Sequence, residues 1–230
     1  MVIKAVIFDL DGTIAAFNLD YKTVRAEVRS HLINNGIPAS LLAVNESIFE
    51  MLSKTKIYLQ NQGKPETAAA QLRKEALNIA EKYELEAAAN TSLFPGAEET
   101  LKTLKAKNLK LALCTINSQK STEYILKRFN LAGFFETTVP REKTPDVKPH
   151  PEHLKIALDA LKTKPHETLV VGDSGSDMQA AKELKTIAVG IPTGVATQDQ
   201  LTRNGANYLV TNIIDLPILI EQLNKANPVS

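Results

Sequence analysis

The sequence predicts an α/β protein with a doubly wound, Rossmann-like core on a parallel sheet and a small all-helical domain inserted near its start. Three observations lead to this prediction. An apolar, β-branched run at 2–8 indicates a buried strand. Residues 14–93 have helical periodicity and no convincing strand pattern. From residue 96 onward, apolar runs alternate with helical segments, an order typical of a parallel sheet covered by helices.

The composition narrows the class of protein. The chain has 27 basic and 26 acidic residues, and 5% of its residues are aromatic, so we expect no nucleic-acid partner. The longest N-terminal apolar stretch is too short for a signal peptide or a membrane span, so no membrane partner is expected. The single cysteine, Cys114, fits a reduced, cytoplasmic setting. We expect a monomer or a homodimer.

The inserted segment is predicted to be helical throughout. Its apolar residues recur at helical spacing in three stretches, at 24–32, from Leu41 to about 61–65, and at about 66–83. A segment of roughly eighty residues is far too long for an ordinary loop. We therefore expect two domains, a core of residues 1–14 and 96–230 and a helical cap of residues 15–95.

The core is predicted to alternate helices and strands after the insert. The expected helices cover 97–106, 121–129, 152–161 and about 177–184, and the expected strands cover 109–114, 168–172, 186–190 and 207–210. Parallel strands place all their carboxyl ends at one edge of the sheet, where open α/β sheets bind ligands.

The first strand is followed directly by two acids, Asp9 and Asp11, and then by Gly12. Buried carboxylates are costly without a partner, so their presence at this edge points to a cation, a catalytic role, or both. A simple turn is the alternative, because Asp and Gly both favour turns.

A hydroxyl residue, Thr115, follows the strand at 109–114 and precedes a helix. Its side chain and the backbone N–H groups of the next residues can bind an anion there. Taken alone, an ordinary helix N-cap explains this residue better.

The segment 146–152 contains Lys148, and its two prolines stiffen this loop just before a helix. A lysine fixed in this way suits a phosphate or a crowded carboxylate. The alternative is a surface lysine in a Pro-rich turn. His150 and His153 are expected to be surface groups at the helix start and not ligands.

Two further acids, Asp173 and Asp177, follow the strand at 168–172 and repeat the pattern of the first strand. Their spacing of four residues allows a first helical turn to aim both at one point.

If the strands are parallel, these four segments meet at one edge. The crowded carboxylates then require a cation, and ligands that are all oxygen favour Mg²⁺. Thr115 and Lys148 provide a complementary anion site, so the expected ligand is a phosphate ester. An Asp nucleophile that forms an aspartyl-phosphate fits this set of residues.

The four segments resemble, in order, the four motifs of the haloacid dehalogenase (HAD) superfamily, and specifically its phosphatases. The segments 8–13 and 172–177 are the most specific, and 148–152 resembles the third motif closely. The helical insert is similar to the cap of the phosphoglycolate phosphatase and β-phosphoglucomutase branch. The resemblance covers the whole chain.

The resemblance implies roles for the acids. Asp9 is the nucleophile and also contacts the metal. Asp11 is the general acid and then the general base, and its backbone carbonyl is a metal ligand. Asp173 binds Mg²⁺, and Asp177 holds the metal or its waters. The implied metal set is therefore Asp9, Asp11, Asp173 and Asp177.

The resemblance also implies a phosphate site made of Asp9, Gly12, Thr115, Ile116 and Lys148. Thr115 would hold the phosphoryl oxygens and Lys148 would neutralise the nucleophile and the phosphate. Many relatives have Asn directly after the motif residue that corresponds to Thr115. Ile116 stands there in this chain, and Asn117 one position later receives no role.

A second departure lies where many relatives carry an Asp shortly after the Gly-Thr pair and this chain has Ile14-Ala15-Ala16-Phe17. The hinges of the cap are expected near 15–17 and 93–96.

The predicted function is Mg²⁺-dependent hydrolysis of a small phosphorylated metabolite, phosphoglycolate or a sugar phosphate. A phosphomutase of the β-phosphoglucomutase type is an alternative that uses the same residues. A catalytically silent binding or regulatory module is an alternative of another class, and the presence of Asp9, Asp11 and Lys148 argues against it.

Overall fold

The computed structural model describes residues 2–16 and 18–226, and Phe17 of the expected hinge lies outside the described residues. The chain divides into two compact units, one of Met1–Phe17 and Asn90–Ser230 and the other of Asn18–Ala89. Within the described part of the chain, no helix is both long and apolar enough to cross a membrane.

The first unit is built on one six-stranded sheet in the order β3-β2-β1-β4-β5-β6, and every neighbouring pair is parallel. The strands are β1 (Ala5–Phe8), β2 (Lys110–Cys114), β3 (Thr137–Val139), β4 (Thr168–Gly172), β5 (Ile187–Gly190) and β6 (Tyr208–Leu209). The strand order reverses direction at β1, between β2 and β4. This switch point is where open α/β sheets bind ligands.

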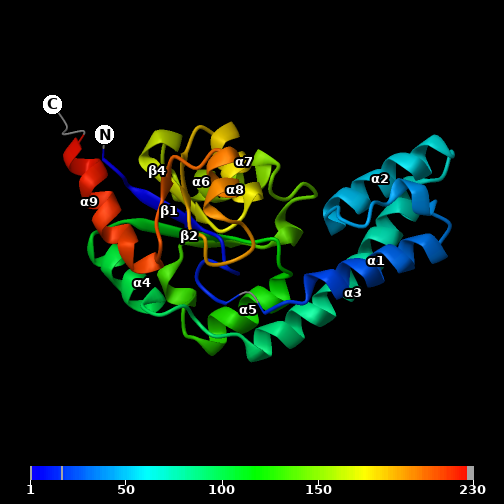
Figure 1. Ribbon diagram of the computed structural model, residues 1–230, viewed down its shortest axis with the longest axis horizontal. Helices are drawn as coiled ribbons and strands as arrows, with labels where there is room; N and C mark the ends of the chain where they lie inside the picture. The colour runs from blue at the N-terminus through cyan, green and yellow to red at the C-terminus, as the bar shows by residue number, and fades with distance from the viewer. Residues whose placement is uncertain (1, 17, 227–230) are drawn as a thin grey trace. The chain divides into compact units, whose positions relative to one another are not determined.

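Helices cover both faces of this sheet, with α6, α7 and α8 on one side and α4 and α9 on the other (Figure 1). The helices of this unit are α4 (Ala97–Ala106), α5 (Gln119–Arg128), α6 (Pro151–Leu161), α7 (Gly175–Glu183), α8 (Gln198–Arg203) and α9 (Leu216–Ala226). The doubly wound α/β core that the sequence predicts is therefore confirmed.

Strand β1 is buried on both faces because helices cover both sides of the sheet. Ala5 and Ile7 belong to a core cluster with residues of α6 and α7, such as Leu154 and Met178. The alternate residues of the strand are equally buried. A run of apolar residues without polar alternation is typical of such a central parallel strand.

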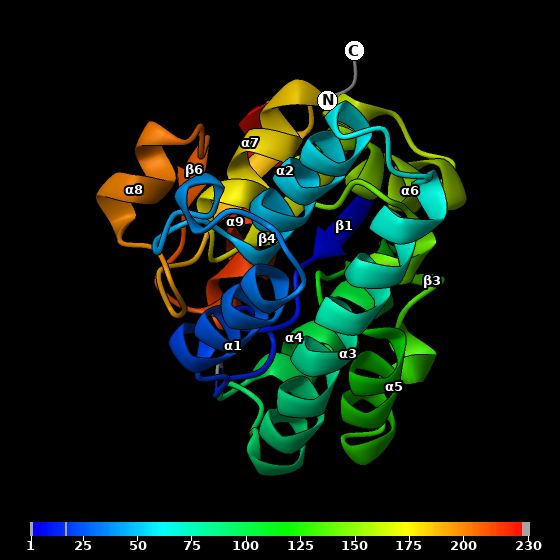
Figure 2. The same ribbon diagram turned by 90° about the vertical axis from the view of Figure 1, so that its right-hand side faces the viewer.

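The second unit is helical, with α1 (Tyr21–Asn34), α2 (Ile48–Asn61) and α3, which begins at Glu66 and ends at Asn90 in the first unit. Figure 2 shows these three helices. They share a core that includes Val28, Met51 and Ala76. A capping box formed by Ser47 and Glu50 starts α2.

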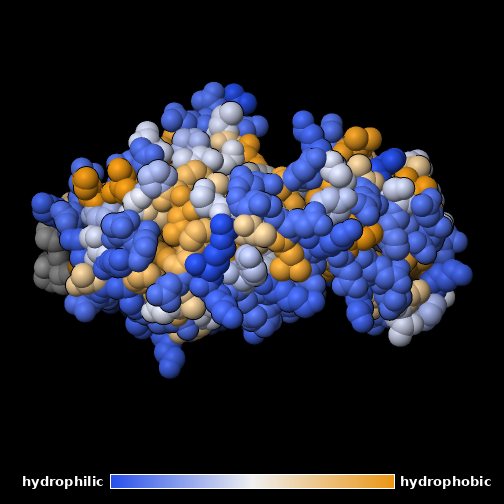
Figure 3. All heavy atoms as spheres, turned by 90° about the horizontal axis from the view of Figure 1, so that it is seen from below, coloured by the Kyte–Doolittle hydropathy of each residue, from blue (hydrophilic) through white to orange (hydrophobic). Residues whose placement is uncertain are grey.

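Some predicted elements differ in the structure. The second helical stretch does not run continuously from Leu41, because a short 3₁₀ turn ends there and α2 begins only at Ile48. Helix α3 extends seven residues beyond the predicted end at residue 83, to Asn90. The sequence analysis did not predict β3, α8 or α9. On the face in Figure 3 hydrophilic residues predominate, with apolar residues interspersed.

Candidate active site

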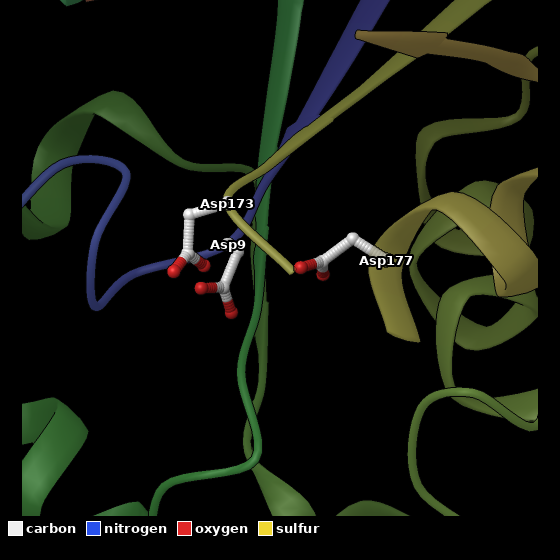
Figure 4. A group of neighbouring side chains, drawn as sticks. All are labelled: Asp9, Asp173 and Asp177. Carbon is white, nitrogen blue, oxygen red and sulfur yellow. The ribbon is translucent and has the colours of Figure 1, made fainter. Parts of the chain in front are cut away.

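Three carboxylates meet at the carboxyl edge of the central strands. Asp9 follows β1 and Asp173 follows β4, and the register of these strands places Phe8 opposite Val171. Asp177 comes from the first turn of α7. One oxygen of each acid lies within 4.8 Å of the others, and Figure 4 shows the Asp9 and Asp173 carboxylates close together. The sequence analysis expected four acids to crowd together here, and the structure brings together Asp9, Asp173 and Asp177.

Lys148 joins this cluster and is itself buried. Its Nζ atom donates to Asp9 Oδ1 at 2.7 Å and to Asp177 Oδ1 at 2.6 Å. A further hydrogen bond, at 2.7 Å, reaches the backbone carbonyl of Cys114. An ammonium group has three donor protons, so these contacts satisfy all of them and fix the charge beside Asp9.

Burial and mutual repulsion make the acids hard to ionise. Burial, against the opposing charge of Lys148 and together with the charge of Asp177, raises the pKa of Asp9 to about 6. Burial raises the pKa of Asp173 to about 8, with added repulsion from Asp9 and Asp177. For Lys148, burial alone would lower the pKa, but the charges of Asp177 and Asp9 outweigh it and raise the pKa.

This charge distribution fits a divalent cation. Three ionised carboxylates against the single ammonium of Lys148 leave two negative charges in a buried cluster. A cation of charge two would neutralise them and favour the ionised form of the acids, against the burial and mutual repulsion that raise their pKa values. The donor set is oxygen only, which suits Mg²⁺.

The three acids differ in how far their carboxylate oxygens are already engaged in hydrogen bonds. Asp177 Oδ1 accepts from Lys148, and its Oδ2 accepts from the Ser174 N–H at 3.2 Å and from the Ser174 hydroxyl. Both oxygens of Asp177 are thus already engaged, which suits a residue that holds Lys148 in place. Asp9 and Asp173, on the two neighbouring strands, are the better candidates for direct ligands.

Asp11 is not part of the carboxylate cluster, although it lies two residues after Asp9. Its Oδ2 accepts a hydrogen bond from the Asn117 amide at 2.6 Å. Asn117 is a residue to which the sequence analysis assigned no role. Its position two residues after Thr115 gives it this contact.

Thr115 is buried at the end of β2, and its hydroxyl accepts from the Asn117 N–H at 3.2 Å. Ser118, not Thr115, caps helix α5 by accepting from the Ser121 N–H. The N-cap alternative for Thr115 is therefore wrong. Ile116 is half-buried, and its carbonyl accepts from Arg141.

Gly12 adopts a left-handed backbone with φ of +77° and packs against Asp173. A Cβ atom at this position would lie 2.4 Å from Asp173 Oδ2, so only glycine fits. Its N–H donates to the Ala15 carbonyl at 2.7 Å, and its carbonyl accepts from the Thr193 hydroxyl.

The loop after β5 also contributes to the site, and the sequence analysis missed it. The Val195 N–H donates to Asp173 Oδ2 at 2.7 Å, and a Cβ atom on Gly194 would lie 1.9 Å from the same oxygen. The loop thereby fixes one side of Asp173. A glycine after a predicted strand at the same sheet edge was the available signal.

The expectation that His153 is a surface group was wrong, because this side chain is fully buried. Its Nδ1 accepts from the Lys148 N–H at 3.3 Å, and its Nε2 lies 3.1 Å from the Val139 carbonyl. The same carbonyl accepts from the Thr115 N–H at 3.1 Å. Burial lowers the pKa of His153 to about 4, assisted by the charge of Lys148, so the ring is neutral at pH 7.

Comparison with known proteins places this site in a family context. A family model described as haloacid dehalogenase-like hydrolase matches residues 6–191. A phosphoglycolate phosphatase of Nitrosospira multiformis is 27% identical over 223 residues, which cover 96% of each chain. The pyrophosphatase PpaX of Bacillus mycoides is 27% identical over 227 residues, covering 97% of this chain and all of the relative.

Solved structures share the fold. A β-phosphoglucomutase from Clostridium difficile aligns with a TM-score of 0.68 at 22% identity, covering 98% of this chain and 99% of the other. A hydrolase from Pseudomonas syringae aligns with a TM-score of 0.67 at 23% identity, covering 96% of this chain and 99% of the other.

Proposed function

The chain belongs to the haloacid dehalogenase-like hydrolase family, and on that premise we propose that it is a Mg²⁺-dependent phosphomonoester hydrolase acting on a small phosphorylated metabolite. Relatives named as phosphatases that align along nearly the whole chain support a phosphate substrate. The observation that carries the proposal is the position of Lys148, which lies 2.7 Å from Asp9 beside two further acids.

Asp9 is the proposed nucleophile. One of its carboxylate oxygens bonds to phosphorus as the bond to the ester oxygen breaks, which gives an aspartyl-phosphate. Lys148 holds the carboxylate in place through the bond to Oδ1 and offsets charge on the transferring group. The Thr115 hydroxyl, at the end of the neighbouring strand, is proposed to orient the phosphoryl oxygens, together with Gly12 and Ile116.

Asp11 is the proposed acid and base. It gives a proton to the departing alcohol, and later takes a proton from the water that attacks the aspartyl-phosphate. Phosphate and the free Asp9 carboxylate result, so the residues return to their starting state.

Asp9 and Asp173, together with the backbone carbonyl of Asp11, are proposed to hold Mg²⁺, with Asp177 holding its waters or Lys148. When bound, the cation neutralises negative charge on the nucleophile and the phosphoryl group.

The setting of this activity is also a proposal. We place it in the cytoplasm, which a single buried cysteine, Cys114, supports. The helical unit is proposed to act as the cap that selects the leaving group. The protein is proposed to work as a monomer or a homodimer.

The test is phosphate release from a panel of phosphorylated compounds, with and without Mg²⁺. The panel includes phosphoglycolate, sugar phosphates, nucleotides, inorganic pyrophosphate and an aryl phosphate. We expect Mg²⁺-dependent turnover that is lost in Asp9→Asn and kept in Asp159→Asn, a matched change of an exposed acid on α6.

Failure to release phosphate from any compound would overturn simple hydrolysis. Conversion of a sugar monophosphate that depends on a sugar bisphosphate would then identify a phosphomutase. Inactivity on every ester together with intact Mg²⁺ binding would identify a silent binding module.

A further inference from the structure

We propose that Asn117 is a positioning residue that orients Asp11 for proton transfer, an inference that rests on the proposed function. The two side chains come from different strands' ends, with Asp11 after β1 and Asn117 after β2. The amide Nδ2 of Asn117 donates to Asp11 Oδ2 at 2.6 Å. A contact this short between an amide and a carboxylate fixes the direction of the carboxyl group.

The backbone holds Asn117 firmly in this position. Its N–H donates to the Thr115 hydroxyl at 3.2 Å, and its carbonyl accepts from the Arg141 N–H at 3.1 Å. The next residue, Ser118, is the N-cap of helix α5. These contacts fix the backbone on both sides of the residue. Asn117 is 6% exposed, so its side-chain amide has little room to turn away from Asp11.

An amide donor suits the two steps in which Asp11 takes part. The side-chain amide of Asn117 donates through Nδ2 to Asp11 Oδ2 whether the carboxyl group is ionised or carries its proton on Oδ1. Oδ2 is therefore kept as an acceptor, and Oδ1 becomes the oxygen that exchanges protons. Neither step requires Asn117 to move.

The proton then follows one route in both directions. In the first step the ester P–O bond breaks as the bond to Asp9 forms, and the ester oxygen takes the proton from Asp11 Oδ1. In the second step the water oxygen bonds to phosphorus, its proton returns to Oδ1, and the bond between Asp9 and phosphorus breaks.

Asn117 also links this route to the phosphate. The residue that orients the acid contacts, through its backbone, the hydroxyl of Thr115. The proposed phosphate-binding hydroxyl and the partner of Asp11 thus lie within one short loop, residues 115–117.

The test compares two esters that differ in their need for an acid. An aryl phosphate has a good leaving group and departs without a proton, whereas an alkyl phosphate requires one. In Asn117→Ala we expect kcat/KM for the best alkyl phosphate of the panel to fall about 10- to 100-fold. For the aryl phosphate kcat/KM should stay within about twofold, while kcat falls because Asp11 also serves as the base.

Controls separate positioning from a general loss of structure. Asn224→Ala removes an asparagine that accepts from the Ile3 N–H near the opposite end of β1. This variant should leave kcat/KM unchanged for both esters. In the background of Asp11→Ala, the change Asn117→Ala should add no further loss, because its effect acts through Asp11. Asn117→Ser, which keeps a donor, should recover part of the alkyl activity.

The outcomes are distinct. Equal losses of kcat/KM on the alkyl and aryl esters in Asn117→Ala would overturn the role of Asn117 while leaving the proposed hydrolase activity intact. A further loss of activity in the Asp11→Ala background would do the same. Absence of turnover by the wild-type protein on every ester would overturn the proposed function, and the role of Asn117 with it.

Discussion

Asp173 is 3% exposed and its carboxyl group lies beside two other acids, so its charge depends on what else occupies the cluster. Its pKa of about 8 exceeds the ordinary value of 3.8. In the metal-free protein the folded state therefore holds a proton that the unfolded chain releases. The stabilisation from this proton is present at low pH and is lost as the pH rises toward 8.

We therefore expect Mg²⁺ to stabilise the protein more at about pH 8.5 than at about pH 6, because a bound cation requires ionised acids. Thermal unfolding with and without Mg²⁺ at the two pH values measures this. Asp173→Asn should raise the Tm of the metal-free protein at the higher pH and abolish the response to Mg²⁺. A response to Mg²⁺ that is equal at both pH values would contradict the assignment of the cluster.

His153 should have the opposite effect on stability, because its folded pKa of about 4 lies below the ordinary value of 6.5. The unfolded chain binds the proton first as the pH falls, so stability is lost between about pH 6.5 and pH 4. The full loss is about 3 kcal/mol. Urea unfolding at several pH values measures it.

The change His153→Gln should flatten this part of the pH profile. His150→Gln, a change of the exposed histidine at the N-cap of the same helix, should leave the slope as it is in the wild type. If both variants keep the wild-type slope, another group causes the acid sensitivity.

At the scale of elements, the loop between β5 and α8 borders the carboxylate cluster at Asp173. Two glycines, Gly12 and Gly194, approach within 2.9 Å of each other's backbone once a Cβ is added, and both border Asp173. The position of Asp173 thus depends on two loops that follow different strands.

We expect Gly194→Ala to weaken Mg²⁺ binding about tenfold or more, because the added carbon would displace the Asp173 carboxylate. Isothermal titration with Mg²⁺ measures the affinity. Gly133→Ala is the matched control, since a Cβ there meets nothing within 4 Å. An unchanged affinity in Gly194→Ala would show that the loop does not restrain Asp173.

The elements also explain what the sequence could and could not predict. Long apolar runs such as β1 and β4 are unambiguous, because a central parallel strand is buried on both faces. Strand β3 has only three residues, two of them half-buried threonines, and offers no such run. Helix α2 begins at Ile48 because the capping box restarts it, a local hydrogen-bond choice that apolar spacing does not contain.

The site follows the same division. The alternation of strands and helices was enough to predict that the segments holding Asp9, Lys148 and Asp173 meet at one sheet edge, since parallel strands bring their carboxyl ends together. The partner of Asp11 was not predictable, because it depends on the side-chain direction of Asn117. The burial of His153 depends on packing against β3, the strand that the sequence analysis missed.

At the scale of the whole molecule, each unit has its own apolar core. Leu32 belongs to the core of the helical unit and Leu104 is buried in the sheet-containing unit. Units with separate cores can unfold separately. The acids that are proposed to bind Mg²⁺ all belong to the sheet-containing unit.

We expect scanning calorimetry to resolve two unfolding transitions, only one of which shifts with Mg²⁺. Leu32→Ala should destabilise the unit whose transition does not shift with Mg²⁺, and Leu104→Ala should destabilise the other unit. Each change should lower the free energy of unfolding of its unit by about 2–5 kcal/mol. A single transition that both variants shift equally would mean that the two units unfold together.

The strand order has a consequence for the newly made chain. Strand β1 leaves the ribosome first, yet its two neighbours, β2 and β4, lie more than 100 and 160 residues later. The helical unit that lies between β1 and β2 in the sequence has its own core and can fold before β1 has a partner strand. Such distant pairing folds slowly, and an unpaired apolar strand is prone to aggregate. Asp9 therefore reaches its final surroundings only after Asp173 has been synthesised, so the carboxylate cluster is among the last parts of the molecule to form.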